Sequence, residues 1–458
     1  MSRLVSNIRR SYLADESSLS WVPVVEEMIA HCSPFTESVD ETLVWAALSH
    51  FFVAVTDGDR GIEHLRNVGV ERKISSLTKI CLANAHKSSS KFKHHKSSKS
   101  KKGFRFIDLF AGIGGFHIAM AENGGRPVFV SEWDDGARLT YCKNFGIVPY
   151  GDIREFTLDE DGEPFDKKTI RMYVPECDIL TAGFPCQPFS LAGVSSRNFH
   201  GIEHGLQCGT QGTLFEDVVQ IAVATSAKAV LLENVKNLAS HDSGRTLPVI
   251  LSRLRESSFR VFPEAPIDGR VAPNWAVQDS SHVSAQRRKR LYFIAIREEF
   301  ATKPFVFPAL KGSQDALVNI GEVIKADSSM TEEEKFNHYG ISQRLWNSHK
   351  RRDRAHEIKG NGFKSGLMTD LTAKAPTLVA RYYKDGKDCL IPRKDDVLGK
   401  RRPPRMLTPT ECLILQTFPN WFELPEFKTP AYKQLGNSIT VKVAERITSS
   451  LVRYLSLK

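Results

Sequence analysis

Residues 104–116 read FRFIDLFAGIGGF, an apolar run that passes directly into a glycine-rich turn. The run has the length and composition of a buried β-strand. The glycines after it lack a Cβ atom and so let a bound molecule approach the backbone. Four further short apolar runs follow at 127–131, 178–182, 229–232 and 291–296, separated by segments long enough for helices. Strands that alternate with helical connections predict an α/β fold with a doubly wound, mostly parallel sheet.

Three polar or aromatic features follow the first strands and favour a nucleoside ligand. The spacing Gly112-x-Gly114-Gly115 differs from the G-x-G-x-x-G pattern of dinucleotide-binding proteins. Glu132 ends the second run and can bind a ribose diol, and Trp133 beside it can stack on a purine. Asp152, in a third turn, can accept a hydrogen bond from an exocyclic amine. Taken singly, each is better explained as a surface charge or a core aromatic. Together at one sheet edge, they predict a site for an adenosyl ligand without a pyrophosphate.

A cysteine in a loop at the same edge has the features of a nucleophile. Cys186 follows the run 178–182 and lies between Pro185 and Pro188, which present it rigidly. Glu233 follows the run 229–232, where a carboxyl group can serve as a general acid. Cations precede the last run and can hold a carbonyl oxygen or a phosphate; they include Arg288 and Arg290. The cysteines do not show zinc-ligand spacing, so we expect no metal.

Composition places the chain among globular proteins of a reducing compartment. Its 458 residues are 41% hydrophobic with a mean hydropathy of -0.28, which is sufficient for a folded core. The longest apolar stretch, at 43–55, is too short to span a membrane. The eight cysteines lack the density of a secreted scaffold, and the first residues lack a signal core. We therefore expect a cytoplasmic protein without a membrane partner.

The charge is concentrated in one segment, and this indicates both a partner and a domain organisation. The net charge is +10, and residues 87–102 carry seven lysines and no acid. Such an excess favours a polyanionic partner. We expect a helical domain at 1–86, a basic flexible linker at 87–102, the α/β domain at 103–296 and a loop-rich lobe beyond it.

In this order along the chain, the motifs resemble those of the DNA (cytosine-5)-methyltransferases, over residues 103–455 or so. The motifs that carry the resemblance are DLFAGIGG at 108–115, Glu132-Trp133, Gly151-Asp152, Pro185-Cys186-Gln187, Glu233-Asn234-Val235, Gln286-x-Arg288-x-Arg290, Arg405-x-Leu-Thr408 and Gln434-Leu-Gly436-Asn437-Ser438. Within the family the chain looks most like the Dcm and EcoRII methyltransferases, which methylate the second cytosine of CCWGG. This closer resemblance lies in QGTLF at 211–215, GNGF at 360–363 and ARYYKDG at 380–386.

The resemblance implies a Rossmann-like methyltransferase fold with a target-recognition domain inserted at 297–429 and a C-terminal helix at 430–458 that returns to the catalytic domain. It implies that Cys186 attacks C6 of a flipped cytosine, that Glu233 protonates N3, and that Arg290, with Arg288 nearby, holds the base. The methyl donor would be S-adenosylmethionine, and the product S-adenosylhomocysteine. The residues that it assigns to the cofactor are Asp108, Phe110, Gly112, Gly114, Glu132, Trp133, Asp152, Ile153, Pro185, Leu214, Asn437 and Ser438. Its candidates for DNA contacts are Thr377, Leu378, Arg381, Tyr383 and Lys384.

Two other functions stay open at this point. One branch of enzymes with these motifs modifies transfer RNA, and a catalytically silent nucleic-acid-binding protein is the second alternative. The long basic lobe argues for duplex DNA, and intact Pro185-Cys186 and Glu233 argue for activity. A nicotinamide oxidoreductase does not fit the glycine spacing. The resemblance leads us to expect a monomer, with a cognate restriction endonuclease as a candidate partner and the nucleoid as its place of action.

Overall fold

The structure is a computed structural model of the chain, and it describes residues 103–457 apart from 146, 148, 160, 186–213, 267–270, 273, 311–318 and 362–363. The expected helical domain at 1–86 and linker at 87–102 lie outside the described residues. The described chain forms two compact units. Unit 1 consists of residues 103–277, 291–307 and 449–457, and unit 2 of residues 278–290 and 308–448. No helix of the described ranges is long and apolar enough to cross a membrane.

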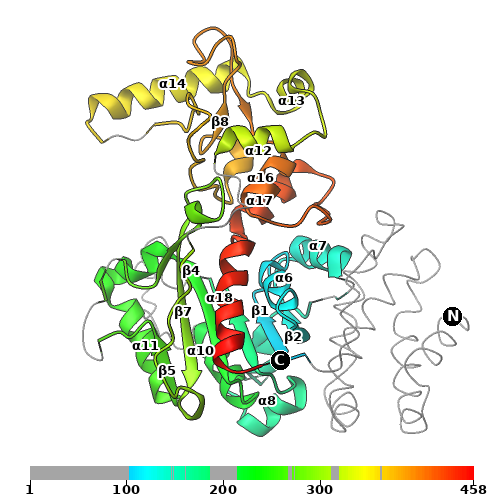
Figure 1. The fold of residues 1–458 in the computed structure, drawn as a ribbon, viewed down its shortest axis with the longest axis vertical. Helices are drawn as coiled ribbons and strands as arrows, with labels where there is room; N and C mark the ends of the chain where they lie inside the picture. Colours follow the sequence, from blue (N-terminus) through cyan, green and yellow to red (C-terminus); the bar gives the residue numbers. More distant parts are fainter. Residues whose placement is uncertain are drawn as a thin grey trace, which may run out of the picture. The chain divides into compact units, whose positions relative to one another are not determined.

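The centre of unit 1 is a β-sheet with the strand order β2-β1-β3-β4-β7-β5, with β6 paired to β7 (Figure 1). The pairs β1–β2, β1–β3 and β3–β4 are parallel, and β5–β7 is antiparallel. The strands are β1 (Arg105–Leu109), β2 (Arg126–Ser131), β3 (Ile179–Ala182), β4 (Ala229–Val235), β5 (Phe259–Phe262), β6 (Val277–Asp279) and β7 (Lys289–Arg297). The five predicted strands and the mostly parallel, doubly wound sheet are confirmed.

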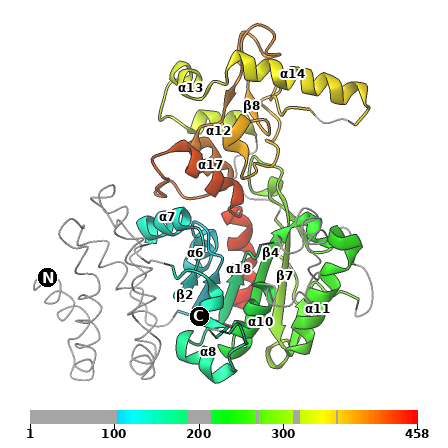
Figure 2. The same ribbon diagram turned by 180° about the vertical axis from the view of Figure 1, so that it is seen from behind.

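Helices connect the strands and cover both faces of the sheet (Figure 2). They are α6 (Gly115–Ala121), α7 (Asp135–Phe145), α8 (Lys167–Tyr173), α10 (Leu214–Ala224) and α11 (Thr246–Glu256), with short 3-10 helices η4 (Ile153–Phe156), η7 (Lys236–Gly244) and η9 (Glu298–Phe300).

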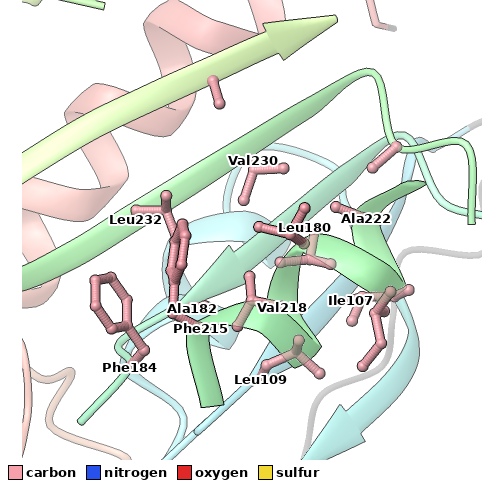
Figure 3. Packing of buried hydrophobic residues seen from close by; sticks show 14 of the residues in the cluster. Ile107, Leu109, Leu180, Ala182, Phe184, Phe215, Val218, Ala222, Val230 and Leu232 are labelled. Carbon is pink, nitrogen blue, oxygen red and sulfur yellow. The ribbon is translucent and has the colours of Figure 1, made fainter. Parts of the chain in front are cut away.

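The largest apolar core lies between the sheet and helices α8, α10 and α11. Ile107 and Leu109 alternate with Phe106 and Asp108 along β1, because successive side chains of a strand point to opposite faces. The first two lie in this core, and Phe106 meets His117 of α6 on the other face. Figure 3 shows how apolar side chains of β1, β3 and β4 meet those of α10. This packing fixes the strands whose ends carry the site.

The order of the strands defines where a ligand site belongs. From β1 the chain moves outward to β2 on one side, and then returns to β3 and β4 on the other side. In open α/β sheets, ligands bind beyond the carboxyl ends of the strands where the order reverses. The glycine-rich turn after β1 and residues 183–185, which directly follow β3, both lie at this switch point.

Unit 2 contains short helices, loops and a two-stranded antiparallel sheet, β8 (Leu390–Ile391) with β9 (Arg405–Met406). Its helices are η8 (Ser280–His282), α12 (Ile320–Ala326), α13 (Glu332–Tyr339), α14 (Gln343–Ile358), α15 (Tyr382–Asp385), α16 (Pro409–Leu415) and α17 (Lys428–Asn437). Helix α18 (Val441–Tyr454) begins in unit 2 and ends in unit 1.

The compact units divide the chain differently from the expected domain bounds. Residues 297–307, expected in the target-recognition domain, belong to unit 1. Residues 278–290, expected in the α/β domain, and residues 430–448, expected in the returning C-terminal segment, belong to unit 2. The reason lies in Arg288, whose buried guanidinium donates to the carbonyl oxygens of Leu378, Gly436 and Ser438. One side chain thus ties three distant segments into a single body, which sequence periodicity does not reveal.

Candidate active site

The glycine-rich turn after β1 has a backbone that demands glycine at two positions for different reasons. Gly112 and Gly114 have φ values of 56° and 90°, a region that residues with a Cβ atom adopt at a cost. A Cβ atom on Gly114 would lie 2.2 Å from Cε2 of Phe145, whereas one on Gly112 would meet nothing within 4 Å. Gly114 therefore lets α7 pack closely, and the backbone at Gly112 borders open space. Phe110 also has a positive φ, of 56°.

Glu132 fastens this turn to the end of β2. Its Oε2 accepts a hydrogen bond from the backbone N–H of Gly112 at 2.7 Å, and its Oε1 accepts one from Asp134 at 2.7 Å. Burial raises the pKa of the Glu132 carboxyl above its usual value, although these two donors oppose the shift. Trp133 beside it is 68% exposed, a rare condition for an indole. An open aromatic face thus lies next to an anchored carboxylate.

The third predicted turn lies against the same strand end. The backbone of Tyr150 pairs with Ser131, and the Ser131 hydroxyl donates to the carbonyl oxygen of Gly151. Asp152 caps η4 through the N–H of Arg154 and pairs with its guanidinium at 2.6 Å. The side chain of Ile153 is 2% exposed and belongs to the core, so only its backbone is available to a ligand.

Asp108 lies fully buried in β1, two residues before Phe110. Its Oδ1 accepts a hydrogen bond from the Thr181 hydroxyl at 2.8 Å, and its Oδ2 has no partner among the described residues. Burial, aided by the nearby charge of Glu132, raises the pKa of Asp108 to about 7, against the lowering effect of hydrogen bonds from the Thr181 side chain and the His117 backbone. A buried carboxyl oxygen without a partner is costly unless it is protonated or meets a ligand.

The ends of β3 and β4 bring the predicted general acid to the start of the Cys186 loop. A Cβ atom on Gly183 would lie 3.7 Å from Oε2 of Glu233. Asn234 Nδ2 donates to the carbonyl oxygen of Phe184 at 2.9 Å, which ties the two strand ends together. Pro185 is described, Cys186 lies outside the described residues, and Leu214 begins α10 and packs on the main core. Glu233 therefore lies beside Gly183, which precedes Cys186 by three residues in the sequence.

Four of the predicted catalytic and cofactor residues belong to unit 2. Arg288 is 2% exposed and bound to three carbonyl oxygens, whereas Arg290 donates to the Lys289 carbonyl and is partly exposed. Asn437 ends α17 with an exposed side chain, and Ser438 follows it. The geometry makes Arg288 an organiser of the backbone around it.

Sequence and structure comparisons place this arrangement in a family. The family model of the C-5 cytosine-specific DNA methylases matches residues 104–453. The chain belongs to this family. It is 36% identical over 433 residues to a DNA-cytosine methyltransferase of Escherichia coli K12, which covers 85% of this chain and 88% of that protein. It is 34% identical to the type II methyltransferase M.DsaV of Dactylococcopsis salina, over 78% of this chain and 88% of the relative.

Solved structures show the same fold at low sequence identity. The Entamoeba histolytica methyltransferase EhMeth superposes with a TM-score of 0.52 at 17% identity, covering 78% of this chain and all of that one. The Dnmt2 methyltransferase of S. pombe gives 0.50 at 15% identity, over 77% and 99% of the two chains. The expected methyltransferase fold is thus confirmed, and this chain is a DNA-cytosine C5 methylase whose family membership implies S-adenosylmethionine as the methyl donor.

The residues around the turn fit that cofactor. The methylase offers open space at Gly112, an exposed indole at Trp133, carboxylates at Glu132 and Asp152, and an unpartnered buried oxygen on Asp108. These groups suit an adenosyl ligand with hydroxyl, amine and cationic parts. Within the described ranges, no group of three or more His, Cys, Asp or Glu side chains is arranged to hold a metal ion.

The side chains of the predicted DNA-contact residues of the methylase differ in their exposure to solvent. Arg381 and Lys384 are exposed, and Tyr383 is partly exposed with Lys384 Nζ 5.8 Å from its ring centroid. Thr377 donates its hydroxyl proton to the carbonyl oxygen of Arg287 at 2.6 Å. The Leu378 side chain is 2% exposed. Burial gives the Leu378 side chain a packing role, and the candidate DNA contact at this position stays a prediction.

One buried network of the methylase was not anticipated. Arg405 forms a two-pronged pair with Glu411, at 2.8 and 2.9 Å, and Lys335 of α13 lies 3.3 Å from the same carboxylate. Thr408 and Glu411 form a capping box at the start of α16. The pattern Thr408-x-x-Glu411 signals such a cap in the sequence, but nothing local to Lys335 indicates a buried lysine.

Proposed function

We propose that this methylase transfers a methyl group to C5 of the inner cytosine of CCWGG in duplex DNA. The observation that carries the chemistry is the position of Glu233, whose carboxylate borders Gly183 at the entry to the Cys186 loop. The resemblance to the Dcm and EcoRII methyltransferases supports the target, and the 36% identity to a bacterial DNA-cytosine methyltransferase is consistent with it.

In the proposed mechanism, the thiolate of Cys186 adds to C6 of cytosine and breaks the conjugation of the ring. Glu233 gives a proton to N3, which allows electron density to collect at C5. General acid assistance of this kind contributes about 10²–10⁴-fold. When bound, S-adenosylmethionine supplies an electrophilic methyl group for C5. Loss of the C5 proton with expulsion of the Cys186 thiolate, and return of the N3 proton to Glu233, then restore the neutral aromatic ring.

Arg290 would hold O2 of the base, and Arg288 would hold in place the segment that carries Arg290. Arg288 fixes the backbone of Leu378, Gly436 and Ser438, and Arg290 is two residues further along the same segment. Because a stacked base cannot meet a cysteine in a protein loop, the cytosine must be flipped out of the duplex at a cost of a few kcal/mol.

The cofactor-binding set would be divided by chemistry. Glu132 would accept from the ribose hydroxyls, Trp133 would stack on adenine, and Asp152 would accept from its amine. Phe110, Gly112, Gly114 and Asp108 would border the methionine part, with further backbone or wall contacts from Ile153, Pro185, Leu214, Asn437 and Ser438. Thr377, Arg381, Tyr383 and Lys384 would meet the DNA.

The decisive experiment uses a CCWGG duplex whose inner cytosine is 5-fluorocytosine. Fluorine blocks the final elimination, so the working enzyme stays covalently bound and migrates as an adduct on a denaturing gel. We expect an adduct that requires S-adenosylmethionine and is absent from the Cys186→Ala variant.

A duplex with a scrambled site and a transfer RNA are run beside it. An adduct on either of these but not on CCWGG would overturn the proposed target and keep the chemistry. No adduct on any substrate would overturn the covalent mechanism and favour a binding protein. We expect the protein to act in the cytoplasm as a monomer, and a cognate restriction endonuclease remains a candidate partner.

A further inference from the structure

The inner face of α14 is anchored to three other segments of unit 2. Trp346 Nε1 donates to the carbonyl oxygen of Gly399 at 2.7 Å. His349, 2% exposed, hydrogen-bonds the carbonyl oxygen of Asp385 at 3.1 Å. Asp353 accepts from the backbone N–H of Ser365 at 3.0 Å. These positions are three and four residues apart, and so they lie on one side of the helix. The helix is held rigidly before any partner arrives.

The opposite face of α14 is exposed and positively charged. Arg344, Arg351 and Arg354 are exposed, and Asn347 and Ser348 lie exposed between them. Arg344 and Arg351 are two turns apart, at about 10 Å along the helix axis. None of the three guanidinium groups has a hydrogen-bond or ion-pair partner among the described residues. Figure 1 shows α14 as the long yellow helix of unit 2.

The acids of the helix do not neutralise this face. The structure describes all of α14, and its two carboxylates are Asp353, which is bound to Ser365, and Glu357, which pairs with Lys364 at 3.5 Å. By helical spacing, both lie away from the line through Arg344 and Arg351. Glu357 is three residues from Arg354 and is shared with Lys364, so the uncompensated charge is greatest at Arg344 and Arg351. A solvated surface normally mixes charges of both signs, and like charges at neighbouring helical positions repel each other. A bound anion would therefore reduce the electrostatic repulsion between the arginines of this face.

We infer that the outer face of α14 contacts the phosphate backbone of duplex DNA through Arg344, Arg351 and Arg354. The inference rests on the proposed function, which supplies duplex DNA as the substrate, and it adds a contact element outside the residues 377–384. Phosphate is the chemistry that fits, because three accessible guanidinium groups on the exposed side of one anchored helix present forked donors to phosphate oxygens. Phosphate contacts fix orientation on the duplex and carry no sequence information.

The test replaces the three arginines with glutamine, R344Q/R351Q/R354Q, in the full-length protein. Glutamine keeps helix propensity and removes the charge. The matched control, K167Q/K168Q/K303Q, removes three exposed charges from unit 1. Binding of a CCWGG duplex and of a scrambled duplex is measured by fluorescence anisotropy over a series of KCl concentrations. A charge-keeping variant, R344K/R351K/R354K, and thermal melting separate lost contacts from misfolding.

Each phosphate contact contributes about 0.9 to the slope of log Kobs against log salt. We expect the glutamine variant to lose up to about 2.7 from this slope, equally on both duplexes, while the control and the lysine variant keep the wild-type slope. An unchanged slope in the glutamine variant would overturn the inference, as would an equal change in the control. A loss confined to the CCWGG duplex would also overturn it and indicate base contacts.

The slope is measured by binding alone, so the result stands apart from the proposed activity. If the wild-type protein forms no adduct on CCWGG, the proposed function fails, and the slope on the scrambled duplex still decides whether α14 contacts phosphates.

Discussion

Among the ionisable groups around the glycine-rich turn, Asp108 shows the clearest difference in pKa between the folded and the unfolded methylase. Its pKa is raised from 3.8 to about 7 by burial. The native state therefore holds a proton that the unfolded state has released between about pH 4 and pH 7. The free energy of unfolding must fall as pH rises through this window and stay low above it. The full effect is on the order of 4 kcal/mol at most.

Asp108→Asn is expected to flatten this pH dependence, because the amide keeps the shape of the carboxyl group and cannot ionise. Urea denaturation at a series of pH values from 4 to 8 gives the free energy of unfolding of both proteins. Asp217, whose pKa is raised to about 6 by burial, contributes to both and cancels in the comparison. Parallel pH curves for the two proteins would show that Asp108 ionises normally in the fold.

Substitutions at the two glycines of the turn are expected to have different effects, one mainly on stability and the other on ligand binding. Gly114→Ala is expected to destabilise the fold by roughly 2–4 kcal/mol, because the new Cβ meets Phe145 in a backbone region that is already strained. Gly112→Ala carries only the strain, about 1–2 kcal/mol, but fills the open space beside the turn. Calorimetric titration with S-adenosylhomocysteine should then show weakened binding by Gly112→Ala at a temperature where it is folded. Binding equal to that of the wild-type protein would mean that the ligand does not approach Gly112.

At the scale of elements, sequence patterns predicted the strands that are continuous and apolar and missed those that are not. β1, β3 and β4 are buried runs, so their composition is sufficient to identify them. β5 is short and has an exposed Arg260, and β6 has three partly buried residues. Both depend on pairing with β7, a tertiary effect that outweighs local preference. The places of candidate site residues after strand ends follow from the sequence, whereas the burial of Asp108 and the carbonyl contacts of Arg288 depend on partners more than 70 residues away.

Helices α13 and α16 are joined by the buried network around Glu411. Glu411→Gln should destabilise unit 2 by about 3–5 kcal/mol, because Arg405 and Lys335 would keep their charges in a buried site without the shared carboxylate. Glu332→Gln is the matched control, since Glu332 contacts the same two cations from a side chain that is 43% exposed, where an ion pair contributes about 0–1 kcal/mol. Hydrogen exchange in α12, α13 and α16 measures the effect. Equal protection in the two variants would contradict a buried electrostatic anchor at Glu411.

At the scale of the whole molecule, charge is distributed unevenly, and this has a measurable consequence. Residues 87–102 supply seven of the positive charges, and without them the net charge of +10 falls to +3. Lysines that lie near duplex DNA release counterions and steepen the dependence of binding on salt. Deleting 87–102 should therefore give a shallower dependence on KCl for specific and scrambled duplexes alike, while calorimetric affinity for S-adenosylhomocysteine stays the same.

This deletion and the glutamine variant of α14 remove charge from separate parts of the chain. If both segments contact phosphates independently, the losses in slope should add when the two changes are combined. A combined slope no shallower than that of the deletion alone would show that the α14 arginines contribute nothing in its absence. An unchanged slope in the deletion alone would instead place the whole electrostatic contribution to DNA binding outside residues 87–102, despite their seven lysines.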